Sequence, residues 1–217
     1  MATPTQFTLY NGALFLLEQP ELSSVDEDKE ARHVLDHFYE DKDAREDCLE
    51  MGNWNFATRT VKIEYNSDID PDFGLQRAFT KPSDWVKTTE MASDEYFDFP
   101  MTDKQYKDEQ GYFFADVDVI YVRYVSDDSS YGKDFSLWPK SFEALVEHYL
   151  AWKIAPRINS KKTVAIKKEF EDARKNARSK DALQEGVKFP PQTGWQAARR
   201  RGGRSGRDIG SRHSLTG

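Results

Sequence analysis

The sequence predicts an α+β fold: a helical bundle made of two N-terminal and two C-terminal helices, a small antiparallel β domain inserted between them, and an extended basic C-terminal arm. Three observations lead to this prediction. Apolar residues recur at helical spacing toward both ends of the first 185 residues. Short segments between them are punctuated by prolines and glycines, and the last residues are rich in Gly, Pro and Arg. The expected parts are residues 1–55, 56–135, 136–185 and 186–217.

The N-terminal part is expected to hold two helices. Residues 7–18 place apolar side chains along one face, and Pro20 stops this helix. A second helix is expected to begin at Ser24, because Ser24 and Glu27 have the spacing of a capping box. Gly52 is expected to end it.

The middle of the chain has the pattern of β-strands. Thr60–Tyr65 alternates apolar and polar residues, which indicates a half-buried strand. Residues 109–111 are typical of a turn, and both faces of Val119–Tyr124 are apolar or aromatic, which suits a central strand. This central stretch lies within the expected segment Val117–Val125, and further strands are expected at Leu75–Thr80, Asp84–Thr89 and Tyr112–Phe114.

Helical spacing returns near Pro139, a residue that suits the first turn of a helix. Apolar residues then follow at intervals of three and four until Pro156, which is expected to end this helix. A fourth helix is expected at residues 160–183. Its apolar seam is thin and its sequence heavily charged, so we expect it to pack on a neighbouring subunit. The seam residues are Ile166, Phe170, Ala173 and Ala177.

Charge is divided unevenly along the chain. Up to Leu150 there are 14 Lys and Arg against 32 Asp and Glu, a net charge of −18. From Ala151 onward there are 17 against 6, a net charge of +11, and the two parts sum to −7. This asymmetry favours a self-complementary assembly or a basic arm that reaches an acidic or phosphate-bearing partner. A solvated tail without a partner stays an alternative.

The single cysteine, Cys48, allows no intrachain disulfide, which fits a reducing compartment. No apolar run approaches the length of a membrane span, and the N-terminus lacks the layout of a secretory signal. These features predict a soluble protein of the cytoplasm without a membrane partner.

No pattern of catalytic residues is present, so we expect no enzymatic activity, no cofactor and no metal. His33 and His37 lie four residues apart, but a metal site needs a further ligand, and acidic neighbours favour a solvated helix face. The run Asp68–Asp72 resembles the start of a calcium loop, but Gly74 comes one place late and the bidentate Glu is missing. Weaker cation binding there stays an alternative. Cys48 is expected to pack as a small hydrophobe.

Several segments occur in an order that resembles one protein family. YNGALFLLEQPELSSVDEDKEA is followed by CLEMGNWNFATRTVKIEY, AFTKPSDWVKTTEM, VDVIYVRYV and LWPKSFEALVEHYLAWKIAPRI. The most specific pieces are Trp54–Ala57, the Lys81–Asp84 step into a strand, and Tyr124 ahead of the helix at Phe142–Leu150. Over residues 7–158, this set resembles tail tubular protein A of short-tailed phages, the head-to-tail adaptor or gatekeeper ring.

The resemblance implies a structural protein of the virion tail, assembled in the host cytoplasm. It implies a homo-oligomeric ring of twelve subunits below the portal protein, which extends the channel for genomic DNA. The lower surface would meet the tail fibres and the tail nozzle, a protein similar to tail tubular protein B. An acidic body suits a channel through which DNA slides. Lys81 stands where the family more usually has an apolar residue, which affects the packing of that corner.

The arm is expected to dock on the portal through aromatic anchors beside arginines, the residue types that often carry binding energy at interfaces. The docking residues would be Phe189, Trp195, Arg199, Arg200, Arg201, Arg204 and Arg207. Two alternatives stay open. Arg-Gly-Gly segments also bind single-stranded nucleic acid, so the chain could be a nucleic-acid-binding protein. The arm could also be a solvated tail.

Overall fold

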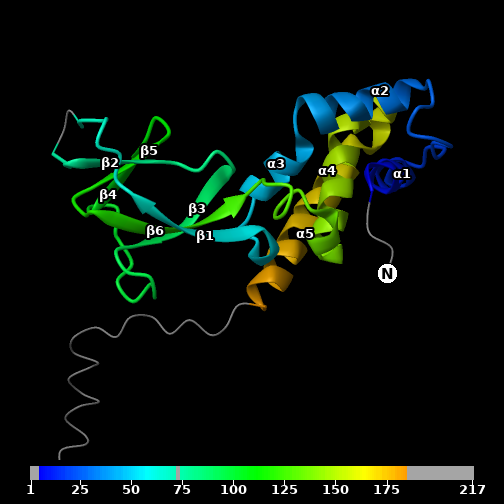
Figure 1. Cartoon of the computed structure of the whole chain (residues 1–217). Helices are drawn as coiled ribbons and strands as arrows, with labels where there is room; N and C mark the ends of the chain where they lie inside the picture. The colour runs from blue at the N-terminus through cyan, green and yellow to red at the C-terminus, as the bar shows by residue number, and fades with distance from the viewer. Residues whose placement is uncertain (1–4, 72–73, 185–217) are drawn as a thin grey trace, which may run out of the picture. The chain divides into compact units, whose positions relative to one another are not determined.

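The computed structural model describes residues 5–71 and 74–184, and this part of the chain has the expected α+β fold (Figure 1). Its helices are α1 (Gln6–Leu16), α2 (Glu30–Asp36), α3 (Ala44–Glu50), α4 (Lys140–Ile158) and α5 (Thr163–Ala182). Its strands are β1 (Thr58–Glu64), β2 (Arg77–Thr80), β3 (Trp85–Ala92), β4 (Tyr106–Glu109), β5 (Tyr112–Ala115) and β6 (Val119–Ser126). The described residues belong to a unit that ends at Gln184. The predicted docking residues of the arm lie outside them.

The second helix begins later than expected, at Glu30 and not at Ser24. The proposed capping box was wrong, because neither side chain bonds to the donor that a capping box requires. The hydroxyl of Ser24 accepts a hydrogen bond from the N–H of Asp26 at 3.2 Å. The carboxylate of Glu27 accepts one from the N–H of Ser23 at 2.8 Å. The two residues therefore shape a turn ahead of the helix.

This second helix is also interrupted. A π-helix, η1 (His37–Asp41), follows α2 directly. Asp43 then adopts a left-handed backbone conformation, with φ 38° and ψ 69°, which Asp tolerates better than most residues. Its carboxylate accepts a hydrogen bond from the N–H of Glu46 at 3.3 Å and so caps α3. The expected single helix is therefore three short helical segments.

The β-rich part contains two antiparallel sheets of three strands, ordered β1-β6-β3 and β2-β5-β4. β6 lies at the centre of its sheet, as the apolar character of both faces predicted. β1 shows the expected alternation of burial. The hairpin between β4 and β5 turns at Gln110 and Gly111, which have positive φ angles of 49° and 83°. β4 was not expected, because its residues are mostly polar and exposed.

α4 and α5 correct two expectations. α4 continues through Pro156 to Ile158, and the N–H of Asn159 bonds to the carbonyl of Ala155 at 2.9 Å beyond the proline. The seam of α5, expected against a neighbouring subunit, packs on α4 of the same chain. Ile166, Phe170 and Ala177 are buried in this core and Ala173 is partly buried. The ring of Phe170 stacks on that of Trp152 at 5.2 Å.

Two hydrophobic clusters form the core of the described part. The larger fills the space among the helices, and Val86 and Val125 extend it to the sheet β1-β6-β3. The smaller combines residues of both sheets, including Phe79, Phe113 and Tyr124. No helix of residues 5–71 and 74–184 is long and apolar enough to cross a membrane.

Asp84 connects β1 and β6 at the start of β3. Its carboxylate accepts hydrogen bonds from Arg59 at 2.8 Å, the hydroxyl of Tyr124 at 3.1 Å and the hydroxyl of Ser126 at 2.5 Å. Burial disfavours the charged carboxylate, but the hydrogen bonds from Ser126, Arg59 and Tyr124 outweigh burial and hold the pKa of Asp84 below its ordinary value. The Lys81–Asp84 step and Tyr124, quoted above as separate motifs, therefore meet in the fold.

Candidate functional site

A pocket of ≈720 Å³ lies between α4 and the face made by α2 and η1. Its volume falls within the range of about 300–1,000 Å³ that is common for ligand sites. Side chains at helical spacing line both walls, so each wall is one face of a helix. The lining residues are Glu30, His33, Val34, His37, Phe38, Lys153, Pro156 and Arg157.

The π-helix η1 supplies His37 and Phe38 to this pocket. π-helices are rare and often occur at functional sites, because the extra residue in the turn changes which side chains face outward. The next residue, Tyr39, is buried and packs edge-on against Tyr10 of α1 at 5.5 Å between ring centroids. The wide turn thus presents Phe38 to the pocket while Tyr39 enters the core.

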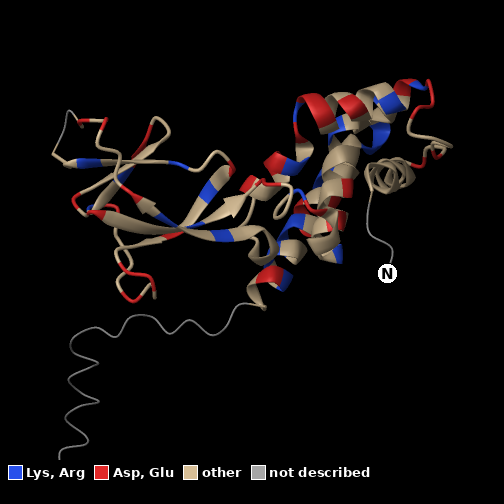
Figure 2. Ribbon diagram, in the orientation of Figure 1, with Lys and Arg blue, Asp and Glu red and all other residues tan. Residues whose placement is uncertain are grey.

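The charged groups at the pocket are mostly basic, and acidic and basic positions are interspersed over α2 and α4 (Figure 2). Arg157 pairs with Glu30 at 2.7 Å between Nε and Oε1. Lys153 has no ion pair among the described residues; its Nζ lies 5.0 Å from the ring centroid of Tyr149 and 4.9 Å from that of Trp152. Lys153 is therefore a cation whose charge is not neutralised by a carboxylate of this part of the chain.

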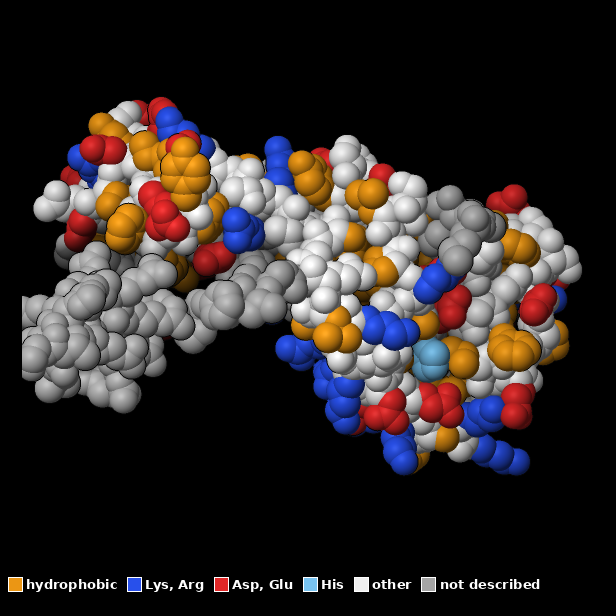
Figure 3. All heavy atoms as spheres, turned by 90° about the horizontal axis from the view of Figure 1, so that it is seen from below, with side chains coloured by type: hydrophobic (Ala, Val, Ile, Leu, Met, Phe, Trp, Pro, Cys, Tyr) orange, Lys and Arg blue, Asp and Glu red, His pale blue; other side chains and the backbone are white. Residues whose placement is uncertain are grey.

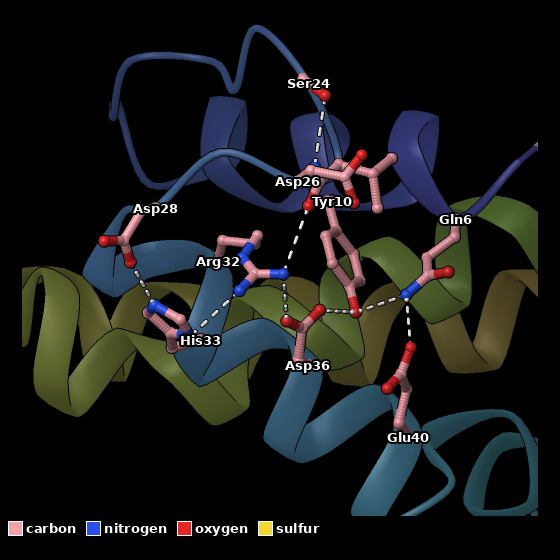
Figure 4. Close-up of polar contacts among 10 residues, drawn as sticks. Gln6, Tyr10, Ser24, Asp26, Asp28, Arg32, His33, Asp36 and Glu40 are labelled. Carbon is pink, nitrogen blue, oxygen red and sulfur yellow. Dashed lines mark hydrogen bonds and ion pairs between the residues drawn. The ribbon is translucent and has the colours of Figure 1, made fainter.

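Both ring nitrogens of His33 are engaged. Nε2 lies 2.7 Å from Oδ1 of Asp28, and Nδ1 lies 3.2 Å from Nη2 of Arg32 (Figure 4). A guanidinium group has only donors, so Nδ1 of His33 accepts and Nε2 carries the proton that it donates to Asp28. His33 is thereby held in one tautomer.

His37 has one engaged nitrogen, Nδ1, which lies 2.9 Å from a carboxylate oxygen of Asp41. Its Nε2 has no hydrogen-bond partner in the described residues. The side chains of His33 and His37 are 54% and 52% exposed, which confirms the interpretation of a solvated helix face.

A polar network behind the pocket joins α1 to α2 (Figure 4). The hydroxyl of Tyr10 donates to Oδ1 of Asp36 at 2.8 Å and accepts from the side-chain amide of Gln6 at 2.9 Å. Arg32 pairs with the other oxygen of Asp36 at 3.2 Å, and Gln6 also donates to Glu40 at 3.1 Å. Burial raises the pKa of Tyr10, so its hydroxyl stays protonated and keeps donating. The network fixes the orientation of α2 and therefore the pocket wall.

The pocket combines charged, imidazole and apolar groups. The ammonium of Lys153, the guanidinium of Arg157 with its partner Glu30, and imidazole rings surround the apolar surface of Val34, Phe38 and Pro156. Lys153 is the charge that is unpaired among the described residues, so the pocket fits a partner that is both acidic and apolar. Within residues 5–71 and 74–184, no group of three or more His, Cys, Asp or Glu is placed to hold a metal ion. Cys48 is buried, as expected, and burial raises the pKa of its thiol.

The sequence pattern did not reveal this site, although His33 and His37 stand out in it. Lys153 and Arg157 recur four residues apart near the end of α4, but only the packing of α2 on α4 brings them to the histidines. The seam residues of α5 contribute to the core, as described above, and not to the pocket. No protein-family model matches the chain, and no curated protein matches it either.

Proposed function

We propose that the chain is a structural virion protein: the head-to-tail adaptor of a short-tailed phage, which forms a ring of twelve subunits between the portal protein and the tail nozzle. The observation that carries this proposal is the ordered set of motifs over residues 7–158, which resembles tail tubular protein A. The ring extends the channel for genomic DNA, and the chain needs no catalytic residue or cofactor for this role.

The contacts made by these motifs support the proposal. Asp84 of the Lys81–Asp84 step bonds to Tyr124 at 3.1 Å and ties three strands together. The indole N–H of Trp54 donates to the carbonyls of Cys48 and Leu49 at the end of α3, both at 3.0 Å. The first contact joins two motifs that lie 40 residues apart in the sequence. The second lies within one motif and holds Trp54 against the end of α3.

The charge distribution supports the proposed channel. The residues up to Leu150 carry a net charge of −18, and a surface of this sign does not hold phosphate groups. DNA that has to move through the ring is better served by such a surface than by a basic one. Assembly would take place in the host cytoplasm, and the tail nozzle and fibres would attach to the surface of the ring that faces away from the portal.

The C-terminal arm, residues 186–217, is proposed to dock on the portal. Fixing the backbone of a binding segment costs about 1–2 kcal/mol of entropy per residue, so we expect each arm alone to bind weakly. Twelve arms on one ring act together and compensate for this cost. Phe189 and Trp195 would be the apolar anchors, with the arginines of residues 199–207 around them.

Electron microscopy of the purified chain mixed with portal rings tests the proposal, with twelve copies below the portal as the expected result. Truncation after Gly186 should abolish attachment and leave Tm nearly unchanged, because the described unit ends at Gln184. Trp195→Ala should weaken attachment more than Arg207→Ala, since buried aromatic anchors usually outweigh exposed charges. A chain that stays monomeric in the presence of portal rings would contradict the proposal.

Nucleic-acid binding is the second candidate, and it is favoured by exposed basic residues close to the arm in sequence. They gather over the helical part of the molecule (Figure 3) and are Lys161, Lys167, Lys168, Lys175, Arg178 and Lys180. Gel shifts of single-stranded DNA and RNA at rising salt distinguish this candidate. Strong binding that falls steeply with salt, together with no portal complex, would favour it.

A further inference from the structure

The loop between β3 and β4 exposes two aromatic side chains. Tyr96 is 77% exposed and Phe99 is 70% exposed, whereas most aromatic residues of the described part are at least partly buried. Glu95 and Asp98 stand beside them, exposed and without an ion pair among the described residues. We call these four residues, Glu95, Tyr96, Asp98 and Phe99, the acidic aromatic tip. Figure 2 shows acidic positions at this loop, and Figure 3 shows hydrophobic side chains among acidic ones on the β-rich part.

The tip is held in place by its own loop. The carboxylate of Asp94 accepts hydrogen bonds from the backbone N–H groups of Tyr96, Asp98 and Phe99, at 3.1, 2.9 and 2.8 Å. Phe97 lies between them with φ 60°, a conformation that bulky residues rarely adopt. Its ring points to Arg123, whose guanidinium carbon is 4.1 Å from the ring centroid. Phe97 therefore anchors the loop while Tyr96 and Phe99 face solvent.

The pocket between α2 and α4 has the complementary chemistry. Its walls are apolar at Val34, Phe38 and Pro156. Its rim carries Lys153, which is unpaired within the described part of the chain, and Arg157 in an exposed pair with Glu30. Its volume of ≈720 Å³ exceeds what one aromatic side chain fills. The tip cannot fill the pocket of its own chain in this structure, because Tyr96 and Phe99 are exposed.

We propose that the acidic aromatic tip of one copy of this chain inserts into the pocket between α2 and α4 of a second copy. Tyr96 and Phe99 enter against the apolar walls, and Glu95 and Asp98 meet Lys153 and Arg157 at the rim. Opposite charges on the two surfaces favour this relative orientation of the two copies over other orientations.

The contact is head-to-tail, because tip and pocket are different surfaces that every copy carries. Such contacts repeat from copy to copy and close into a ring when the rotation permits. The inference therefore rests on the proposed ring and names the surfaces through which its subunits meet. Burying the exposed parts of two aromatic side chains removes about 300 Å² on one partner, less than half of what a stable interface buries, so one contact alone is weak.

Photocrosslinking of the full-length chain tests this contact directly. Tyr96 is replaced by benzoylphenylalanine in copies labelled with ¹⁵N, which are mixed with unlabelled copies, irradiated and digested. Mass spectrometry is expected to find the probe attached to unlabelled peptides that contain residues 30–38 or 153–157. The same probe at Phe15, which is 72% exposed on α1, is the matched control and should not label these peptides.

Light scattering of the same samples separates the two proposals. A twelve-subunit mass without adducts in residues 30–38 or 153–157 would overturn the inference and leave the proposed ring intact. Adducts in these peptides without a closed ring would support the contact and count against the ring. Neither assembly nor adducts at high protein concentration would overturn both.

Charge reversal adds an independent readout. Asp98→Lys and Lys153→Glu should each raise the concentration for half-maximal assembly roughly tenfold, and the double variant should recover most of the loss. Glu109→Lys and Lys168→Glu reverse exposed charges elsewhere and should have little effect. Circular dichroism checks that each variant is folded. Equal effects of the tip, pocket and control variants, or no recovery in the double variant, would contradict the contact.

Discussion

The backbone N–H of Asn55 donates a hydrogen bond to Oδ1 of Asp181 at 3.1 Å, and the side-chain amide of Asn55 donates to the carbonyl of Asp181 at 3.0 Å. These bonds join the segment that leads into β1 to the last turn of α5, across 126 positions of sequence. Asp181 is one of two buried polar residues in the described part, the other being Ser126. The pair holds the end of α5 close to the point from which the arm continues.

Asp181→Ala should therefore destabilise the fold by about 1–2 kcal/mol, because the backbone N–H of Asn55 loses its part-buried hydrogen bond to the side chain of Asp181. Urea unfolding measures this change, and hydrogen exchange should show faster opening of the last turns of α5. Lys180→Ala, at the exposed neighbouring position, is the control and should change stability by less than about 0.5 kcal/mol. Equal effects of the two changes would argue against the role of the Asn55 contact.

Asp84→Asn should cost about 2 kcal/mol, because the charge-assisted hydrogen bonds from Arg59, Tyr124 and Ser126 are lost or weakened. The pKa of Asp84 is lowered in the fold, so its contribution is present above the ordinary value of 3.8 and is lost as pH falls through the lower folded value. The difference in stability between the unaltered chain and this variant should thus disappear only in strong acid. Thermal melts from pH 2 to 7 provide the measurement. Glu64→Gln, in an exposed pair with Lys62, should change Tm little.

Glu147 should respond to pH in the opposite sense. Burial, and secondarily the nearby Glu143, raise the pKa of Glu147 from 4.5 to about 7. The folded chain then binds a proton that the unfolded chain has released, so stability falls as pH rises from about 4.5 to 7. Glu147→Gln should stabilise the fold above pH 7 by about 1 kcal/mol, after allowance for solvent screening, and should have little effect near pH 4. Melting curves across this range, with the exposed Glu169→Gln as control, would contradict the prediction if the two variants behave alike.

Phe170→Ala should unfold the chain more easily by about 3–5 kcal/mol, because Phe170 packs on Trp152 and Tyr149 in the core. Val164→Ala, on the same helix but 83% exposed, should be nearly neutral. Denaturant unfolding of dilute protein separates this intrachain role from a contact between subunits. If Phe170→Ala kept a normal unfolding midpoint but no longer formed the ring, the seam of α5 would pack on a neighbouring subunit, as the sequence had led us to expect.

Gly111→Ala and Gly74→Ala form a matched pair. A Cβ atom would meet nothing within 4 Å at either glycine, but only Gly111 has a positive φ, 83°. Gly111→Ala should cost about 1 kcal/mol through strain in the β4–β5 turn, whereas Gly74→Ala should be neutral or slightly stabilising. Equal changes in Tm for the two variants would mean that the turn relaxes without cost.

The sequence determined the class of the fold and most of its elements. Period-two alternation placed β1, apolar residues on both faces placed β6 at the centre of its sheet, and helical spacing placed α1, α4 and α5. These patterns are local, because the apolar residues of each element face a core at the same spacing no matter which elements form that core. The same reasoning missed β4, whose polar residues are held by hydrogen bonds to β5 and not by burial.

The tertiary structure decided the contacts between elements, which local sequence patterns do not specify. Three features depend on which elements pack side by side: the break of the second helix at Asp43, the burial of the α5 seam against α4, and the presence of His37 and Lys153 in one pocket. Thin apolar seams are compatible with a partner in the same chain or in another, and only packing selects between them. The sequence alone thus determined which residues tend to be buried and which exposed. The tertiary structure decided which residues they contact, because contact energies depend on neighbours that lie far away in the chain.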